Sequence, residues 1–193
     1  LSLSYTLIGP QGAHALANTP QMRRLTTLEL AGAGIEDAGL EALASARHLS
    51  GVRRLDVSMC ELSAEGMRHL ARADHLEHLE SLELLGQPLG PAGLEALLGA
   101  PHLRGLRALG LGHARLGDEG ARALAKSGRG EALEHLDVSL CQIGPEGARA
   151  LASASQLAGL VRCAMAHNAL GEDGVGALAG AAAWAGREAV DLR

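Results

Sequence analysis

Three histidines at a constant spacing are the first residues of this sequence whose arrangement could do chemistry. His48, His75 and His102 follow one another at intervals of 27 residues, and imidazole is the commonest metal ligand in proteins. A metal with ligand bonds of about 2.1 Å needs ligands that converge on one point, whereas neighbouring turns of a repeat stand roughly 5 Å apart. We therefore interpret this histidine row as a scaffold position that repeats, and we expect no metal site.

Two further sets of residues could resemble catalytic groups. His135 and Asp137 could form an acid/base pair, and Cys60, Cys141 and Cys163 could supply thiol nucleophiles. However, no nucleophile or enclosed pocket is expected beside His135, and the cysteines fall in scaffold positions, where a buried thiol acts as a small apolar group. The sequence also lacks a glycine-rich phosphate loop after a strand and a GxSxG motif. We expect neither catalysis nor a cofactor.

These residues belong to a unit of 27 residues that occurs seven times. The units begin at Leu1, Leu28, Leu55, Leu82, Leu109, Leu136 and Cys163, and an eighth starts at Val190. We call each position within the unit a column, counted from the first residue. Alternating apolar residues in columns 1 and 3 predict a short, half-buried strand. Proline or acidic residues in columns 10 and 11, followed by an invariant leucine in column 16, predict a helix.

Column 12 is glycine in every unit. Glycine inside a helix costs about 1 kcal/mol relative to alanine. Such a repeated choice indicates a steric requirement, and we predict that the helix crosses the strand layer too closely for a side chain at this column.

The unit predicts a curved α/β solenoid. Neighbouring strands stack about 4.8 Å apart while helices pack roughly 8 to 10 Å apart, so the array must bend with its strands inside. We expect a horseshoe of about seven strand-turn-helix units, with parallel strands on the concave face and helices on the convex face. Residues 1–193 then form a single domain. Because neither end shows a polar cap, we expect a segment of a longer protein.

The repeated motif resembles a known family. The strand pattern LxxLxL at residues 25–30, followed by a turn and G-x-x-x-L-A, resembles leucine-rich repeats of the ribonuclease-inhibitor type. The helix motif at residues 12–17, 120–125 and 147–152 is also similar to the GAxALA signature of bacterial GALA effectors. The resemblance implies protein binding through the concave face. It also implies that column 6, which holds Cys60, Cys141 and Asn168, bonds to the backbone of the turn.

Columns 27, 2, 4 and 5 are expected to line the concave face. The candidate partner-binding residues in these columns are Tyr5, Glu29, Arg54, Asp56, Met59, Glu83, Leu85, His113, His135, Asp137, Leu140, Arg162 and His167. Column 2 is acidic in many units, and Asp191 belongs to it as well.

The charges and the apolar residues of this face each allow two interpretations. Arg54 could pair with Glu29, Asp56 and Glu83 in an exposed lattice worth about 0–1 kcal/mol per pair, or the acids could form a track that steers a basic partner. Met59, Leu85 and Leu140 could be scattered surface residues, or they could form an apolar centre with a polar rim.

Bulk composition narrows the function further. A formal net charge of −5, from 22 acidic and 17 basic residues, does not fit a nucleic-acid footprint. The chain contains neither an apolar run of membrane length nor a signal peptide, so we expect either a cytoplasmic protein or a secreted effector. Its arginine-rich composition favours a bacterial source. We expect a non-catalytic scaffold that binds a protein, with a basic patch as one option for that partner. The alternatives are a substrate-recognition arm of a larger effector, ubiquitin-ligase-linked or sensor protein, and an array that stacks end to end.

Two units depart from the pattern. The fifth has Ser127 and Gly128 leading into a glycine where other units place a core leucine, which predicts a looser connection. The seventh has Trp184 in that leucine column and Arg187 in another core column, which predicts that the array ends or changes near residue 187.

Overall fold

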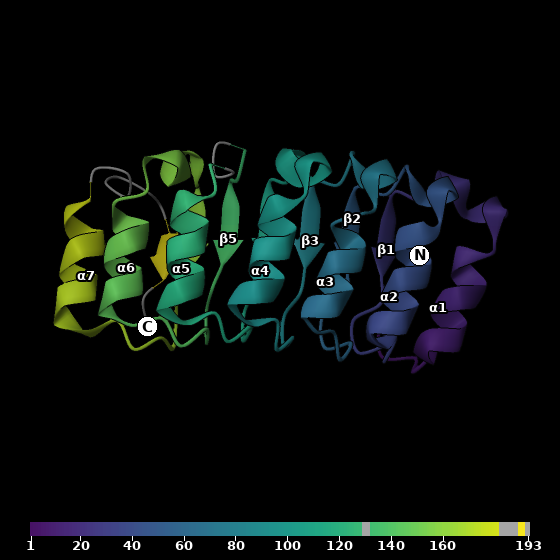
Figure 1. Ribbon diagram of the computed structural model, residues 1–193, viewed down its shortest axis with the longest axis horizontal. Coiled ribbons are helices and arrows are strands. Elements are labelled where there is room, and N and C mark those ends of the chain that lie inside the picture. The colour runs from purple at the N-terminus through teal and green to yellow at the C-terminus, as the bar shows by residue number, and fades with distance from the viewer. Residues whose placement is uncertain (129–131, 182–188, 192–193) are drawn as a thin grey trace.

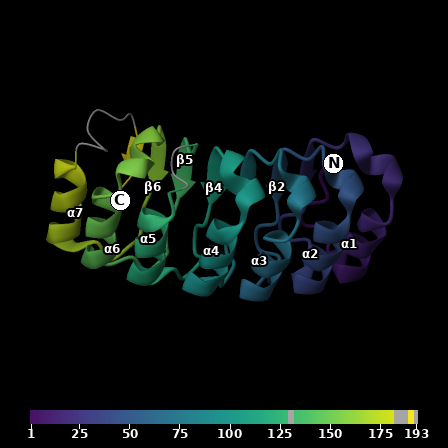
Figure 2. The ribbon, with the colours of Figure 1, turned by 45° about the horizontal axis from the view of Figure 1, so that its top comes forward.

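The computed structural model describes residues 1–128, 132–181 and 189–191. Within these ranges, seven α-helices alternate with the strands of a seven-stranded parallel sheet, whose spatial order β1 to β7 follows the chain. The helices stand side by side in one layer and the strands form the other (Figure 1), and the turned view shows the same two layers (Figure 2). This arrangement confirms the predicted α/β solenoid.

Each unit contributes a three-residue strand and a short helix. The strands are β1 (Thr27–Glu29), β2 (Arg54–Asp56), β3 (Ser81–Glu83), β4 (Ala108–Gly110), β5 (His135–Asp137), β6 (Arg162–Ala164) and β7 (Ala189–Asp191). The helices are α1 (Gly9–Ala17), α2 (Glu36–Ser45), α3 (Ala64–Leu70), α4 (Gly90–Gly99), α5 (Gly117–Lys126), α6 (Pro145–Ala152) and α7 (Gly171–Gly180). Short 3-10 helices return the chain to the sheet at Pro20–Arg24, Arg47–Leu49, Asp74–Leu76, Pro101–Gly105 and Ser155–Gly159.

The strand register turns every column into a straight row across the sheet. Leu28 pairs with Leu55, which pairs with Leu82, and the same step of 27 residues continues to β7. Residues that share a column are therefore neighbours in space, one strand apart. Comparing the same column between units therefore shows which residues are neighbours on the surface.

Aliphatic side chains fill the space between the two layers. Leu30, Ile35 and Leu40 of the second unit are fully buried, and the corresponding columns of the third to sixth units repeat the pattern. Because the core consists of stacked layers of this kind, each unit contributes apolar contacts mainly to its two neighbours.

Column 6 bonds to the backbone of the turn, as expected. The Cys60 thiol donates to the Leu30 carbonyl at 2.9 Å, and the Cys141 thiol donates to the Leu111 carbonyl at 3.0 Å. The Asn168 amide accepts from the backbone N–H groups of Cys141 and Ile143, both at 3.0 Å. These bonds satisfy buried backbone groups that no strand reaches.

The glycines of column 12 occupy a tight position, but their close neighbours are not the ones predicted. A Cβ on Gly39 would lie 2.9 Å from Ala13 Cβ in α1, 2.9 Å from Ile35 Cβ and 3.3 Å from the Pro10 Cα. The steric limit therefore comes from the preceding helix and the column 8 side chain, and not from the strand layer. Small residues at this crossing allow adjacent helices to approach closely.

Two aspartates of column 10 cap the helix of the following unit. Asp118 Oδ1 accepts from the backbone N–H groups of Gly144 (2.7 Å) and Gly147 (2.9 Å), at the start of α6. Asp37 Oδ1 accepts from those of Ser63 (2.9 Å) and Gly66 (3.0 Å), at the start of α3. The sequence predicted these acids only as residues at the start of their own helix.

Some predictions fall on residues that the structure does not describe. The connection after α5 includes residues 129–131, and both Trp184 and Arg187 lie outside the described ranges. None of the described helices has the length and apolarity needed to cross a membrane.

Candidate functional site

The predicted acidic residues form one row on the strand face, the exposed surface made by columns 27, 2, 4 and 5. Register places Glu29, Asp56 and Glu83 next to one another, and Gly110 separates Glu83 from Asp137. The side chain of Asp191 lies outside the described residues. Members of the row on neighbouring strands are about 4.8 Å apart, because that is the spacing of the strands.

Large apolar side chains form a second row beside the acids. Met59, Leu85 and Leu140 are 42 %, 42 % and 45 % exposed, and Tyr5 at the first unit is 69 % exposed. Each of the first two leans over a glycine of the next unit: Met59 Cγ lies 3.0 Å from the position of a Cβ on Gly86, and Leu85 Cδ1 lies 2.8 Å from that on Gly112.

The cationic candidates and the remaining histidines complete the face. Arg54, His135 and Arg162 share column 27, while His113 and His167 lie in column 5, and all five are exposed. The structure therefore brings every predicted residue onto one surface, with the acids central and the cations and apolar residues on either side.

Column 5 has an unusual backbone that sequence reasoning missed. Its non-glycine residues have positive φ angles: Tyr5 59°, Met59 50°, His113 63°, Leu140 56° and His167 57°. This left-handed region costs an L-residue roughly 1–2 kcal/mol relative to the right-handed one, and glycine adopts it freely. The two glycines in the same column, Gly32 and Gly86, were the only sequence signal for it.

The predicted pairing of Arg54 with the acids is wrong. Among the described residues no ion pair contains Arg54; the pairs along the sheet join Arg53 to Glu80 and Arg107 to Glu134, the latter at 2.8 Å. The register explains the difference, because Arg54 lies opposite the uncharged Thr27 and Ser81. The acids of column 2 lie two residues further along each strand, about 6.6 Å away.

Glu83 therefore carries its charge in an unfavourable environment. Partial burial raises the pKa of its carboxyl group, and the neighbouring carboxylates Asp56 and Asp137 raise it further. The Glu83 carboxylate extends over Gly110 into the space that a side chain there would fill, which brings it toward Asp137.

The third and sixth units present the same local structure. Asp56 Oδ1 accepts from the Ser58 backbone N–H at 2.9 Å, and Asp137 Oδ1 accepts from that of Ser139 at 2.8 Å. In each case the next residue is a large apolar side chain, Met59 or Leu140, and a buried cysteine follows. The face thus carries two equivalent acidic and apolar pairs, three strands apart.

The thiols are unsuited to nucleophilic chemistry. Burial raises the pKa of Cys141 to about 11 and that of Cys163 to about 12. Since the thiolate is the nucleophile, these residues act as structural groups, as predicted.

The histidine row lies on the 3-10 helices that return the chain to the sheet. The Nε2 atoms of His48 and His75 are buried without a hydrogen-bond partner in the described structure, and burial lowers the pKa of His75. Within the described ranges, no group of three or more His, Cys, Asp and Glu side chains is arranged to hold a metal ion.

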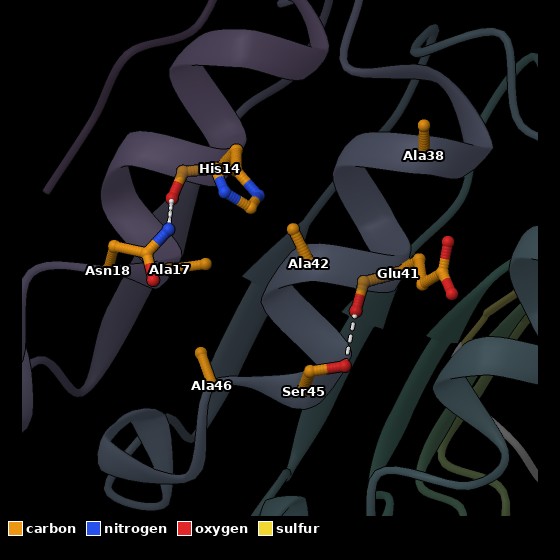
Figure 3. Close-up of a pocket in the computed structure, with 8 residues that line it drawn as sticks. All are labelled: His14, Ala17, Asn18, Ala38, Glu41, Ala42, Ser45 and Ala46. Atoms are coloured by element: carbon orange, nitrogen blue, oxygen red, sulfur yellow. Dashed lines mark hydrogen bonds between the residues drawn. The ribbon is translucent and has the colours of Figure 1, made fainter.

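A groove on the helix face is less suited to recognition. It lies between α1 and α2, has a volume of about 330 Å³ and is lined by His14, Ala17, Asn18, Ala38, Glu41, Ala42, Ser45 and Ala46 (Figure 3). The Asn18 amide donates to the His14 carbonyl and the Ser45 hydroxyl to the Glu41 carbonyl, both at 2.9 Å. The Asn18 and Ser45 side chains are thus engaged by the backbone of the preceding turn, and four alanines make up much of the remaining wall.

Stacked strand-turn-helix units with one parallel sheet define the class of the molecule, a repeat solenoid. The leucine-rich repeat family model matches residues 21–44, 49–71, 102–125 and 132–152, which supports a leucine-rich repeat protein. A comparison with curated proteins found no match. Leucine-rich repeats generally mediate protein–protein interactions and are typically non-catalytic scaffolds.

Proposed function

We propose that this chain is a non-catalytic recognition scaffold that binds a protein partner on its strand face, and that the partner contributes a basic patch. The repeats act in this proposal as one binding domain of the ribonuclease-inhibitor type. A unit of 27 residues with an α-helix in each unit supports that subtype. The GAxALA helix motif supports a relation to bacterial effectors.

The unpaired acidic row is the observation that carries the proposal. Glu29, Asp56 and Glu83 have no cationic partner within the described structure, while Glu80 and Glu134 at the start of the strands are paired with arginines. A row of like charges one strand apart is unfavourable in the free protein. A basic partner would relieve that repulsion and would also be attracted from a distance.

Exposed apolar side chains beside the acids support the same surface. Column 5 has a positive φ angle in every unit, so this backbone conformation belongs to the turn of the repeat. Met59 and Leu140 keep large apolar side chains exposed there, where glycine or asparagine would cost less. This choice of residue favours an apolar contact next to the acidic row.

Affinity capture with matched charge variants tests the proposal. The strand-face variant Glu29→Lys/Glu83→Lys changes two carboxylates that make no hydrogen bond to the backbone in the described structure. The control Glu95→Lys/Glu172→Lys makes the same change in net charge at exposed positions of α4 and α7. We expect a protein that the parent and the control capture and that the strand-face variant loses. Equal capture by all three baits, with thermal unfolding showing that each is folded, would contradict the proposal.

A further inference from the structure

The strand face presents its chemistry in straight rows that cross the strands. The acidic row contains Glu29, Asp56, Glu83 and Asp137. The apolar row beside it contains Met59 and Leu140 from column 5 and Leu85 from the adjacent column 4. Since both rows run perpendicular to the strands, a complementary partner must carry a basic stripe and an apolar stripe that lie side by side and share the same direction.

The spacing of the rows selects the secondary structure of that partner. Strands repeat about every 4.8 Å, and one turn of an α-helix rises about 5.4 Å, so a helix laid along the rows can place a side chain at each strand. An extended peptide in the same orientation presents same-face side chains about every 6.8 Å and loses register within two strands. Four strand steps from Glu29 to Asp137 span about 19 Å, which corresponds to about 13 helical residues.

Gly110 at the end of β4 and Gly112 two residues later are covered by side chains of the preceding unit. The Glu83 carboxylate and the Leu85 side chain lie over these two glycines and fill the space that side chains there would take. A carboxylate and a leucine therefore occupy the centre of the face, and a partner helix laid across the strands would contact both.

The equivalent acidic and apolar pairs of the third and sixth units also match the spacing of helical turns. The pairs Asp56 with Met59 and Asp137 with Leu140 are three strands apart, about 14 Å, and three helical turns rise about 16 Å. A helix would meet both pairs with residues about 11 positions apart, which lie on the same face.

We infer that the partner element bound by the strand face is a basic amphipathic α-helix of about four turns, lying across the strands with its cationic stripe on the acidic row and its apolar stripe on Met59, Leu85 and Leu140. This inference rests on the proposed function and specifies the partner's chemistry and shape. Its apolar stripe would cover side chains that are now about half exposed.

Synthetic peptides of about 15 residues test the inference with the intact chain. The striped peptide carries lysines at i, i+4, i+7 and i+11 with leucines on the adjacent face. A second peptide has the same composition with its lysines distributed around the helix, and a third is the striped peptide with a central proline. Fluorescence anisotropy gives the affinities, and circular dichroism reports helix formed on binding.

We expect the striped peptide to bind at least about tenfold more tightly than either of the other peptides, and to gain helix. The Glu29→Lys/Glu83→Lys and Leu85→Ser/Leu140→Asn variants should each weaken this binding by about tenfold or more. The Glu95→Lys/Glu172→Lys control should bind within about twofold of the parent, since electrostatic attraction by net charge alone is equal in the two charge variants.

The outcomes separate the inference from the proposed function. Equal binding of all three peptides, lost in the strand-face variants, would overturn the helical partner and leave the basic partner standing. Absence of measurable binding by the striped peptide would also overturn the helical partner. Tight binding that no strand-face variant weakens would overturn both.

Discussion

Neighbouring glutamates of one strand segment show how strongly position decides the properties of a residue. Glu80 precedes β3 and pairs with Arg53, whereas Glu83, three residues later, lies among carboxylates and over Gly110. The two side chains are chemically identical. Their difference in environment comes from the register with the adjacent strands.

At the residue scale, Glu83→Gln should stabilise the protein at pH 7. Because the pKa of Glu83 is raised, its ionised form is disfavoured in the folded state. The stability that protonated Glu83 contributes is fully present below the ordinary pKa of 4.5 and is lost as the pH rises through the pKa of the folded state. The gain should be up to about 1 kcal/mol, because solvent screens part of the repulsion. Urea unfolding at pH 7 and at pH 4 measures it, and the gain should shrink at the lower pH.

Glu80→Gln is the matched control for this prediction. It removes a carboxylate that is paired with Arg53, so it should leave stability unchanged or lower it at pH 7. A loss of stability in both variants would mean that the repulsion around Glu83 does not matter.

Helices α3 and α6 each have an N-terminal cap supplied by the preceding unit. The N-terminus of α6 has no side-chain cap of its own at Gly144, and its backbone N–H groups donate two hydrogen bonds to Asp118 in α5. In α3, by contrast, the Ser63 hydroxyl accepts from the Glu65 backbone N–H at 3.1 Å, in addition to the hydrogen bonds that backbone N–H groups donate to Asp37. Capping across the unit boundary couples one helix to the next.

At the element scale, Asp118→Ala should destabilise the protein more than Asp37→Ala. The first substitution leaves the start of α6 without a side-chain acceptor, which should cost about 1–2 kcal/mol. The second leaves the Ser63 cap in place and should cost less. Chemical denaturation of both variants, followed by far-ultraviolet circular dichroism, makes the comparison. If Asp37→Ala costs as much or more, the local serine cap does not compensate for the lost carboxylate.

The histidine row exists only in the stacked molecule. His75 has 7 % of its side chain exposed and lies between the units that carry His48 and His102. Burial lowers its pKa, the nearby Asp74 opposes this effect, and Arg47, His102 and His48 add to the lowering. A proton on His75 would thus be buried next to other cationic groups.

At the scale of the whole molecule, the array should lose stability in weak acid. Because the folded pKa of His75 is below its ordinary value of 6.5, the unfolded chain takes up the proton first. Stability then falls as pH drops below about 6.5, by at most about 1.4 kcal/mol per pH unit for one group. His75→Gln should reduce this dependence, and thermal unfolding between pH 7 and pH 5 measures it.

His78→Gln provides the control, since His78 is exposed and lies three residues further along the same connection. Glutamine already occupies the histidine column at Gln21 and Gln156, so His75→Gln is compatible with the scaffold. An unchanged pH profile in His75→Gln would show that this residue does not cause the acid sensitivity.

The sequence by itself determined the repeat, the fold class and the membership of the strand face. A strict period of 27 residues leaves the strands one possible register, so residues of one column had to become neighbours in a row. That reasoning correctly grouped Glu29, Asp56, Glu83 and Asp137, as well as the apolar residues beside them.

Only the tertiary structure decided how these side chains and backbones meet. It replaced the expected Arg54 lattice with pairs such as Arg53–Glu80, moved the close contact of the column 12 glycines from the strands to the preceding helix, and revealed the positive φ angles of column 5. The period of the repeat predicts which residues of one column are adjacent. It does not predict the direction of each side chain or the distances of a few ångströms between packed elements. Ion pairs, caps and steric limits depend on those short distances, which arise when the units stack.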